Sequence, residues 1–195
     1  MKKVTYQSAL SLFEQWYAEA LKLPVNTPSA MVLSSVDEDG RPSSRVVLLK
    51  QWDQKGFVFY TNVTSRKAKN LDTNPYASLL FYWDNLRKQV RIEGAVEKVS
   101  SAEAQQYFQT RPLESRWGTW ASKQSESLKE RAMLEERYLY FQRKYPEDVP
   151  TPKFWGGYRL KPDRFEFWEN GEFRLHHRLL FEKQQTGWVS DTLYP

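Results

Sequence analysis

The spacing of hydrophobic positions changes several times along this chain. From Ser8 to Leu23 they recur at the three- and four-residue spacing of an amphipathic helix, which Pro24 would end. Short apolar stretches divided by turn residues follow. They predict strands at Ala30–Val36, Ser44–Lys50, Gly56–Thr61, Ala77–Trp83 and Lys88–Val99, with a short helix at Thr64–Leu71. The first half therefore predicts one helix followed by a meander of antiparallel strands.

The second half begins with helices and returns to strands. Ser100 and Glu103 have the spacing of a capping box, for a helix that runs to about Thr110 and is stopped by Pro112. The longest helical pattern is Glu126–Arg143, and after a Pro-rich link strands are expected at Arg164–Trp168, Arg178–Lys183 and Trp188–Leu193. Short turns rather than crossover helices join most strands, which disfavours a parallel sheet. We expect one α+β domain over residues 1–195, with a helical segment at about 100–145 and a C-terminal β region at 156–195.

Composition excludes several classes of protein. Hydrophobic residues make up 40% of the 195, and aromatic residues 15%, so the chain can bury a core and is not disordered. No apolar run is long enough to span a bilayer, and no secretory apolar region follows Met1-Lys2-Lys3. The absence of cysteine removes disulfides, thiolate catalysis and iron–sulfur clusters. These features predict a cytoplasmic protein without a membrane partner.

Charge and motifs narrow the chemistry further. The net charge of +5 favours an anionic partner but does not choose among nucleic acid, membrane and phosphorylated small molecules. The basic residues are scattered and no RNA-recognition signature occurs, so no nucleic-acid partner is expected. Dinucleotide, P-loop and Gly-x-Ser-x-Gly motifs are missing. His176 and His177 would point to opposite faces of a strand, so no metal site is expected.

Two groups of residues could bind phosphate. Arg66 and Lys67 open the short helix, whose free N–H groups already favour anions, although a solvated basic face is an alternative. Tyr107 and Arg111 share one helix face, and Ser115 follows just past the helix, which suits a phosphate monoester. The alternative for the second group is a core tyrosine and an arginine paired with an acid.

Two further segments carry polar residues among apolar ones. Arg45 and Lys50 have odd spacing, so either a bulge redirects one of them or they serve different parts of a site. An edge ion pair and an exposed lysine form the alternative. Arg174 and His176 share strand parity and can face one cavity, where Trp168 would offer a stacking surface for a planar ring. An ordinary hairpin with cross-strand pairs explains the same residues.

Taken together, these segments resemble the pyridoxamine 5′-phosphate oxidase (pyridoxine 5′-phosphate oxidase) family, from about Leu12 to Pro195. The matching segments, in order, are Ser44–Lys50, Phe59–Asn62 with Ser65–Lys67, Gln89–Arg91, Tyr107–Pro112, Ser122–Ser125, Phe154–Gly157 and Glu166–Arg178. The resemblance implies an antiparallel split β-barrel with peripheral helices. It also implies a homodimer with FMN at the subunit interface.

The resemblance assigns a role to each candidate residue. It implies that FMN is bound by Arg45, Lys50, Tyr60, Thr61, Arg66, Lys67, Gln89, Gln124, Ser125, Trp168 and Arg178. It implies that the substrate phosphate is bound by Lys50, Tyr107, Arg111 and Ser115, with Arg174 and His176 as catalytic residues beside the pyridine ring. The implied reaction oxidises a phosphorylated B6 vitamer to pyridoxal 5′-phosphate with dioxygen and releases hydrogen peroxide. A different substrate for the same flavoprotein fold is the alternative.

Three departures from the family pattern bear on the substrate side. His177 stands where an acid is usual, which is expected to loosen Arg178. Thr27 stands where an acid commonly precedes the proline at position 28. The N-terminal segment that covers the substrate in family members is expected to be missing here, because the first helix begins close to Met1.

Overall fold

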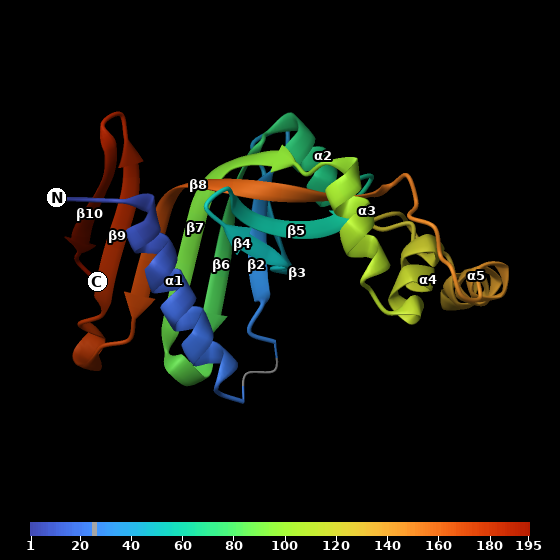
Figure 1. Ribbon diagram of the computed structural model, residues 1–195, viewed down its shortest axis with the longest axis horizontal. Helices are drawn as coiled ribbons and strands as arrows, with labels where there is room; N and C mark the ends of the chain where they lie inside the picture. Colours follow the sequence, from blue (N-terminus) through green and yellow to red (C-terminus); the bar gives the residue numbers. More distant parts are fainter. Residues whose placement is uncertain (25–26) are drawn as a thin grey trace.

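Over residues 1–24 and 27–195, which the computed structural model describes, ten strands form one antiparallel sheet (Figure 1). The strand order is β1-β10-β9-β8-β7-β6-β2-β3, while β5 pairs with β8 and with β4. The strands are β1 Lys2–Val4, β2 Ala30–Val36, β3 Pro42–Leu48, β4 Gln51–Asp53, β5 Gly56–Asn62, β6 Tyr76–Trp83, β7 Lys88–Lys98, β8 Trp155–Glu169, β9 His177–Gln184 and β10 Gly187–Leu193. The antiparallel α+β architecture expected from the short connections is confirmed.

Five α-helices accompany this sheet in the described part of the chain: α1 Tyr6–Leu21, α2 Arg66–Thr73, α3 Ser101–Gln109, α4 Leu113–Ala121 and α5 Arg131–Lys144. The Ser100 hydroxyl accepts a hydrogen bond from the N–H of Glu103 at 3.1 Å, as the capping pattern indicated. The carboxylate of Glu103 instead binds Arg159, so only half of the capping box forms. Pro112 ends α3 but also immediately precedes α4, a helix that the sequence analysis missed. None of the described helices is long and apolar enough to cross a membrane.

A bulge in the long strand β8 divides the sheet. The first part of β8 pairs with β5 on one side and the last part pairs with β9, while β7 runs along both parts. The register shifts between Glu93 and Gly94, which face Arg164 and Pro162. Proline has no N–H to donate there, and a Cβ on Gly94 would lie 2.0 Å from the carbonyl oxygen of Lys161. The predicted strand Arg164–Trp168 covers only the last part of β8 and was wrong in its start, because Gly156, Gly157 and Pro162 interrupt the pattern of residue types.

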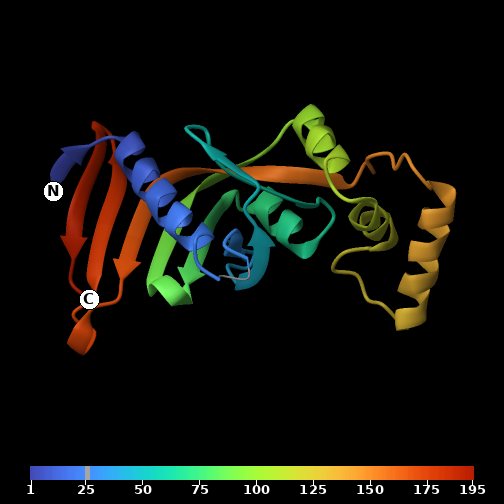
Figure 2. The same ribbon diagram turned by 60° about the horizontal axis from the view of Figure 1, so that its bottom comes forward.

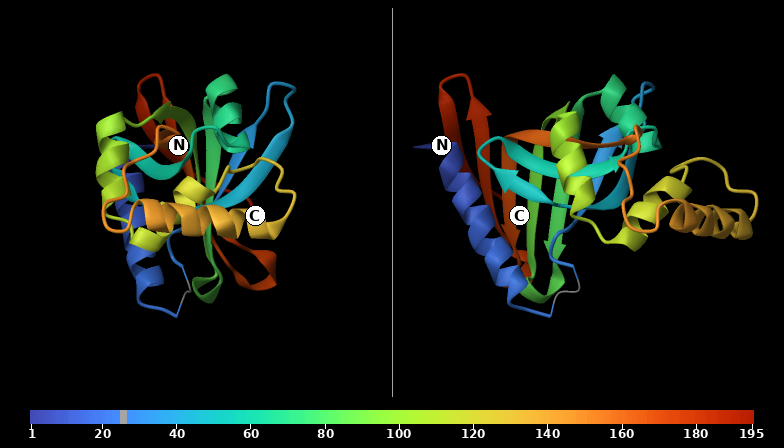
Figure 3. Two further views of the ribbon diagram at one scale, coloured as in Figure 1. Left: turned by 90° about the vertical axis from the view of Figure 1, so that its right-hand side faces the viewer. Right: turned by 45° about the vertical axis from the view of Figure 1, so that its right-hand side comes forward.

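Helix α1 covers one face of the sheet and buries most of the core (Figure 2). Phe13 lies on this covering face and contacts Phe57 and Phe81, with ring centroids 5.0 and 5.3 Å apart. Trp16 meets Phe167 edge to face at 5.3 Å. A separate, smaller cluster around Phe108, Trp117 and Val149 joins the helical segment. Helices α4 and α5 lie beyond the edge of the sheet, at the end of the molecule away from β9 and β10 (Figure 3).

Candidate functional site

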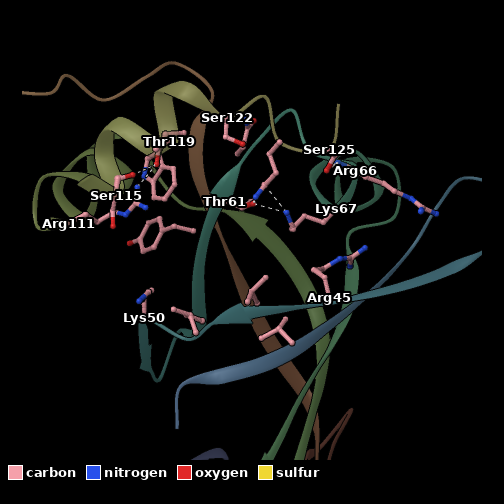
Figure 4. Close-up of a pocket in the computed structure, with 18 of the residues that line it drawn as sticks. Arg45, Lys50, Thr61, Arg66, Lys67, Arg111, Ser115, Thr119, Ser122 and Ser125 are labelled. Carbon is pink, nitrogen blue, oxygen red and sulfur yellow. Dashed lines mark hydrogen bonds between the residues drawn. The ribbon is translucent and has the colours of Figure 1, made fainter. Parts of the chain in front are cut away.

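A cavity of about 880 Å³ lies where β3, β5 and α2 meet α3 and α4 (Figure 4). Its volume is in the upper part of the range for small-molecule sites. Eleven of the residues singled out from the sequence line it: Arg45, Lys50, Tyr60, Thr61, Arg66, Lys67, Tyr107, Arg111, Ser115, Gln124 and Ser125. Residues from five separate segments of the chain thus converge on one cavity.

Lys67 and Arg66 lie at one end of this cavity, at the start of α2 (Figure 4). Lys67 is only 8% exposed, and its ammonium donates hydrogen bonds to Thr61 Oγ1 at 3.1 Å, Ser65 Oγ at 3.3 Å and Gln124 Oε1 at 2.9 Å. Burial, together with nearby Arg45, lowers the pKa of Lys67 to about 8. The alternative of a solvated basic face is therefore wrong for Lys67, whereas Arg66 is exposed.

Arg45 approaches the same end from β3 and is fixed by neutral oxygens. Its Nη1 donates to the carbonyl of Leu33 at 3.1 Å and to Ser35 Oγ at 2.8 Å, and its Nη2 donates to Ser43 Oγ at 2.6 Å. Burial lowers the pKa of Arg45, and Arg66 lowers it further. Arginine stays protonated at ordinary pH, so this end of the cavity carries a guanidinium beside a buried ammonium.

Arg111 marks the other end of the cavity (Figure 4). Its Nη1 donates to Thr119 Oγ1 at 2.6 Å, and its guanidinium lies 4.5 Å from the centre of the Trp155 ring. Ser115 and Thr119 both come from α4, and Thr119 was not among the residues predicted for the site. Lys50 also lines this end. It lies two residues past the last residue of β3, Leu48, so strand alternation does not apply to it. Its side chain is exposed, as the alternative expected, and it lines a different part of the cavity from Arg45.

An aromatic wall lies beside this second end. The rings of Tyr60 and Tyr107 stack with centroids 4.1 Å apart and planes 10° apart, and Trp155 lies parallel to Tyr60 at 6.2 Å. Burial raises the pKa of Tyr60 to about 12, and Glu103 contributes to the rise. Tyr107 therefore lines the cavity instead of the core, and the wall offers a flat aromatic surface.

The cations of the cavity differ from other cations of the protein in their partners. Within residues 1–24 and 27–195, no ion pair includes Arg45, Lys67 or Arg111. Arg159, by contrast, is buried away from the cavity and pairs with Asp53 and Glu103 at 3.2 and 2.9 Å. Neutral partners satisfy the donors without cancelling the charge, so both ends of the cavity attract anions.

Five predicted site residues lie elsewhere, in a second cluster. Gln89, Trp168 and Arg178 are cross-strand neighbours on β7, β8 and β9. The ring of His176 lies 4.7 Å from that of Trp168, and its Nδ1 accepts the N–H of Gly171 at 3.2 Å. The expectation that Arg174 and His176 share strand parity was wrong, because residues 172–174 form a 3₁₀ turn in which Arg174 has a φ of 65°. None of the five lines the cavity within one chain.

Arg178 is held firmly although His177 replaces an acid. Glu166 is 3% exposed and accepts hydrogen bonds from Nε and Nη2 of Arg178 at 2.9 and 2.8 Å. Nη1 of the same guanidinium donates to the carbonyl of Tyr194 at 2.8 Å. The exposed His177 faces Glu169 across the strands. The expected loosening of Arg178 is therefore absent from this geometry.

Comparison with known families agrees with this arrangement. Residues 17–142 match the family model described as pyridoxamine 5′-phosphate oxidase. Residues 155–195 match the pyridoxine 5′-phosphate oxidase C-terminal dimerisation region. The chain belongs to the pyridoxamine 5′-phosphate oxidase family. Four of the five residues in the second cluster fall within the matched dimerisation region.

Individual members of the pyridoxamine 5′-phosphate oxidase family are similar over nearly the whole chain. A pyridoxine/pyridoxamine 5′-phosphate oxidase of Bordetella pertussis is 52% identical, covering 98% of this chain and 93% of that protein. A pyridoxine/pyridoxamine 5′-phosphate oxidase of Escherichia fergusonii is 45% identical, covering 95% of this chain and 86% of that protein. Among solved structures, PhzG from Burkholderia lata has a TM-score of 0.92 and is 32% identical, covering 96% of this chain and 92% of that chain. It was solved in complex with tetrahydrophenazine-1-carboxylic acid. An FMN-binding protein from Nostoc punctiforme shares the fold, with a TM-score of 0.76 and 20% identity over the full length of both chains.

Proposed function

We propose that this protein oxidises pyridoxamine 5′-phosphate and pyridoxine 5′-phosphate to pyridoxal 5′-phosphate, with FMN as cofactor and dioxygen as electron acceptor, releasing hydrogen peroxide. The observation that carries the proposal is a cavity with uncompensated cations at two ends and a flat aromatic wall beside one of them. One end suits the phosphate of a flavin nucleotide, and the other suits the phosphate of a small aromatic substrate. The family and the relatives at 45–52% identity support the same reaction.

The residues at the α2 end fit FMN. Arg45, Arg66 and Lys67 would bind its phosphate, assisted by the polar groups of Gln124 and Ser125. Thr61 lies beside Lys67 at this end, and Tyr60 and Lys50 line the cavity toward the other end, where the flavin ring would extend. Bound FMN supplies the hydride acceptor and the site of reoxidation by dioxygen, so the chain itself has to bind, orient and exclude water.

The residues at the α4 end fit the substrate. Arg111 and Ser115, with Tyr107 and Lys50, would bind its phosphate. Thr119 holds one donor of Arg111, and the Trp155 ring lies against the guanidinium, so the remaining donors of Arg111 stay free for an anion. Arg111 is thereby positioned to bind the phosphate of a substrate that lies beside the flavin.

A second copy of the chain would complete the cavity. Gln89, Trp168 and Arg178 would reach the flavin from the partner, and Arg174 and His176 would lie beside the substrate ring. A two-fold dimer generates two equivalent sites in this way, and the matched dimerisation region supports it. We expect sedimentation to show a dimer at micromolar concentration. A monomer that holds FMN at that concentration would overturn the shared site.

The visible spectrum of the purified protein and its peroxide release test this function. We expect a flavin spectrum, release of FMN on denaturation, and peroxide formation on addition of pyridoxamine 5′-phosphate or pyridoxine 5′-phosphate. The unphosphorylated vitamers are the control, because they lack the anion that Arg111 and Ser115 would bind. Equal rates with and without the substrate phosphate would contradict the role of the α4 end.

A second candidate follows from the similarity to PhzG. That protein was solved with a reduced phenazine carboxylic acid, so a carboxylated polycyclic substrate could occupy the same end of the cavity. The higher identity to the oxidases, 52% against 32%, favours the phosphorylated vitamer. The peroxide assay distinguishes the two candidates when both substrate classes are tested, since we expect only the phosphorylated vitamers to be oxidised at low substrate concentration.

A further inference from the structure

A polar cluster of Ser35, Ser43 and Asn70 lies against the terminal nitrogens of Arg45, and of these three residues only Ser43 lines the cavity. Ser35 and Asn70 are 1% and 5% exposed. The side-chain amide of Asn70 donates to Ser35 Oγ at 3.3 Å and to Ser43 Oγ at 3.1 Å. The same two hydroxyls accept hydrogen bonds from Nη1 and Nη2 of Arg45, at 2.8 and 2.6 Å. Asn70 is therefore joined to the guanidinium through one hydroxyl on each side.

These hydrogen bonds leave Arg45 little freedom. A serine hydroxyl accepts at two lone pairs, and in each serine both are taken, one by Arg45 and one by Asn70. The amide thus fixes the two serines, and the two serines fix the plane of the guanidinium. Asn70 lies three residues after Lys67 on α2, so one face of this helix places the ammonium and also orients the guanidinium from β3.

The chemistry of the cluster is as informative as its geometry. Arg178 is held by the carboxylate of Glu166, which compensates its charge. Arg45 is held just as closely by hydroxyls, a carbonyl and, behind them, an amide, none of which carries charge. An aspartate at position 70 would offer a similar shape but would cancel the guanidinium. The neutral amide keeps Arg45 positioned and fully charged.

We propose that Asn70 is a positioning residue that, through Ser35 and Ser43, aims Arg45 at the anion end of the cavity and leaves its charge uncompensated, so that the protein prefers a phosphorylated flavin to an unphosphorylated one. The proposal rests on the proposed function, in that the FMN phosphate is the anion bound at this end. Asn70 would then help to determine which flavin is bound, although it is buried and does not line the cavity.

The charge-changing variant Asn70→Asp tests this directly. Apoprotein is titrated with FMN and with riboflavin, following flavin fluorescence, and the ratio of the two dissociation constants is the readout. A carboxylate joined to the guanidinium through one hydroxyl on each side should lower the preference for FMN by roughly tenfold or more, at an effective dielectric constant of about 20. Riboflavin binding should change by less than about twofold. Asn85→Asp, which adds the same charge at the exposed β6–β7 turn, should leave the ratio unchanged.

A second variant, Asn70→Ala, tests whether Asn70 positions Arg45 or only stabilises the fold, and it replaces the first test if Asn70→Asp does not fold. Asn70→Ala should lower the FMN preference about three- to tenfold in the wild-type background, because the serines lose their anchor. In an Arg45→Ala background the same change should have almost no effect on the ratio, since the residue it orients is gone. An equal loss in both backgrounds, or an unchanged ratio in Asn70→Asp, would overturn the proposal. A wild-type protein without any preference for FMN would instead contradict the proposed function.

Discussion

The buried ammonium of Lys67 makes flavin binding depend on pH. Burial lowers its pKa from the ordinary value of 10.5 to about 8, because no carboxylate compensates the charge and Arg45 repels it. At about 1.4 kcal/mol per pH unit, this corresponds to about 3 kcal/mol against the charged form in the ligand-free protein. A phosphate at this end would supply the missing negative charge and raise the pKa again, so binding of FMN and protonation of Lys67 are coupled.

Raising the pH through the pKa of Lys67 should increase the folding stability of the ligand-free protein but decrease its affinity for FMN. In the ligand-free protein the unfolded chain binds the Lys67 proton more tightly between about pH 8 and 10.5, so the contribution of Lys67 to stability rises with pH across that window. For FMN the charged form binds better. Its affinity should be level below pH 8 and should fall as the ammonium deprotonates, to about tenfold weaker at pH 9 than at pH 7.

Fluorescence titration of apoprotein with FMN at several pH values from about 6.5 to 9 measures this dependence. Lys67→Met keeps the length of the side chain and should bind FMN more weakly at pH 7, with no fall above pH 8. Lys69→Met, at an exposed position of the same helix, should keep the wild-type profile. If wild type and Lys67→Met fall in parallel above pH 8, the ammonium is not the titrating group and the reasoning fails.

Three further variants have expected outcomes. Glu166→Gln leaves the guanidinium of Arg178 without its buried counter-charge and should lower stability by about 3 kcal/mol in thermal unfolding. Gly157→Ala brings a Cβ to 2.6 Å from the Tyr60 ring and should weaken flavin binding as well as stability, by about 1–3 kcal/mol. His177→Asp should change stability and FMN affinity by less than about 1 kcal/mol at any pH, because Arg178 already has a partner.

Each of these expectations can fail separately. A Glu166→Gln protein as stable as wild type would show that Arg178 finds other partners. Unchanged flavin affinity in Gly157→Ala would mean that Tyr60 can move without affecting the cavity. A gain in FMN affinity for His177→Asp that is largest at acidic pH would restore the view that the histidine repels Arg178, and would contradict the geometry of Glu166.

Strands with one buried face could be predicted closely from the sequence. Ala30–Val36 matches the bounds of β2, and Ala77–Trp83 differs by one residue from β6, because each is a short apolar stretch bounded by turn residues. The first part of β8 could not be found in this way. Gly156 and Gly157 are typical of a turn, but here a Cβ at either position would collide with a neighbouring side chain, so they permit close packing within a strand.

Proline misled the prediction of the helical segment. Pro112 lies beyond the end of α3 at Gln109, as predicted, but the residue just before a helix also tolerates proline, because the first N–H groups of a helix need no partner. The helix α4 that begins after it carries Ser115 and Thr119 into the cavity. Local patterns could not show that a new helix begins directly after the proline, since that depends on the packing of Trp117 with Phe108 and Val149 in the smaller hydrophobic cluster.

The cationic residues of the cavity could be predicted, but their partners could not. Net charge gave no location for an anion site, since 24 acidic residues are distributed over the same chain. What creates the site is which arginines the fold places next to a carboxylate. Arg178 meets Glu166 across two strands, whereas Arg45 meets two serines and, behind them, Asn70. Those neighbours are set by strand register and by the placement of α2, so a single acid introduced behind Arg45 would alter the site far more than its effect on net charge suggests.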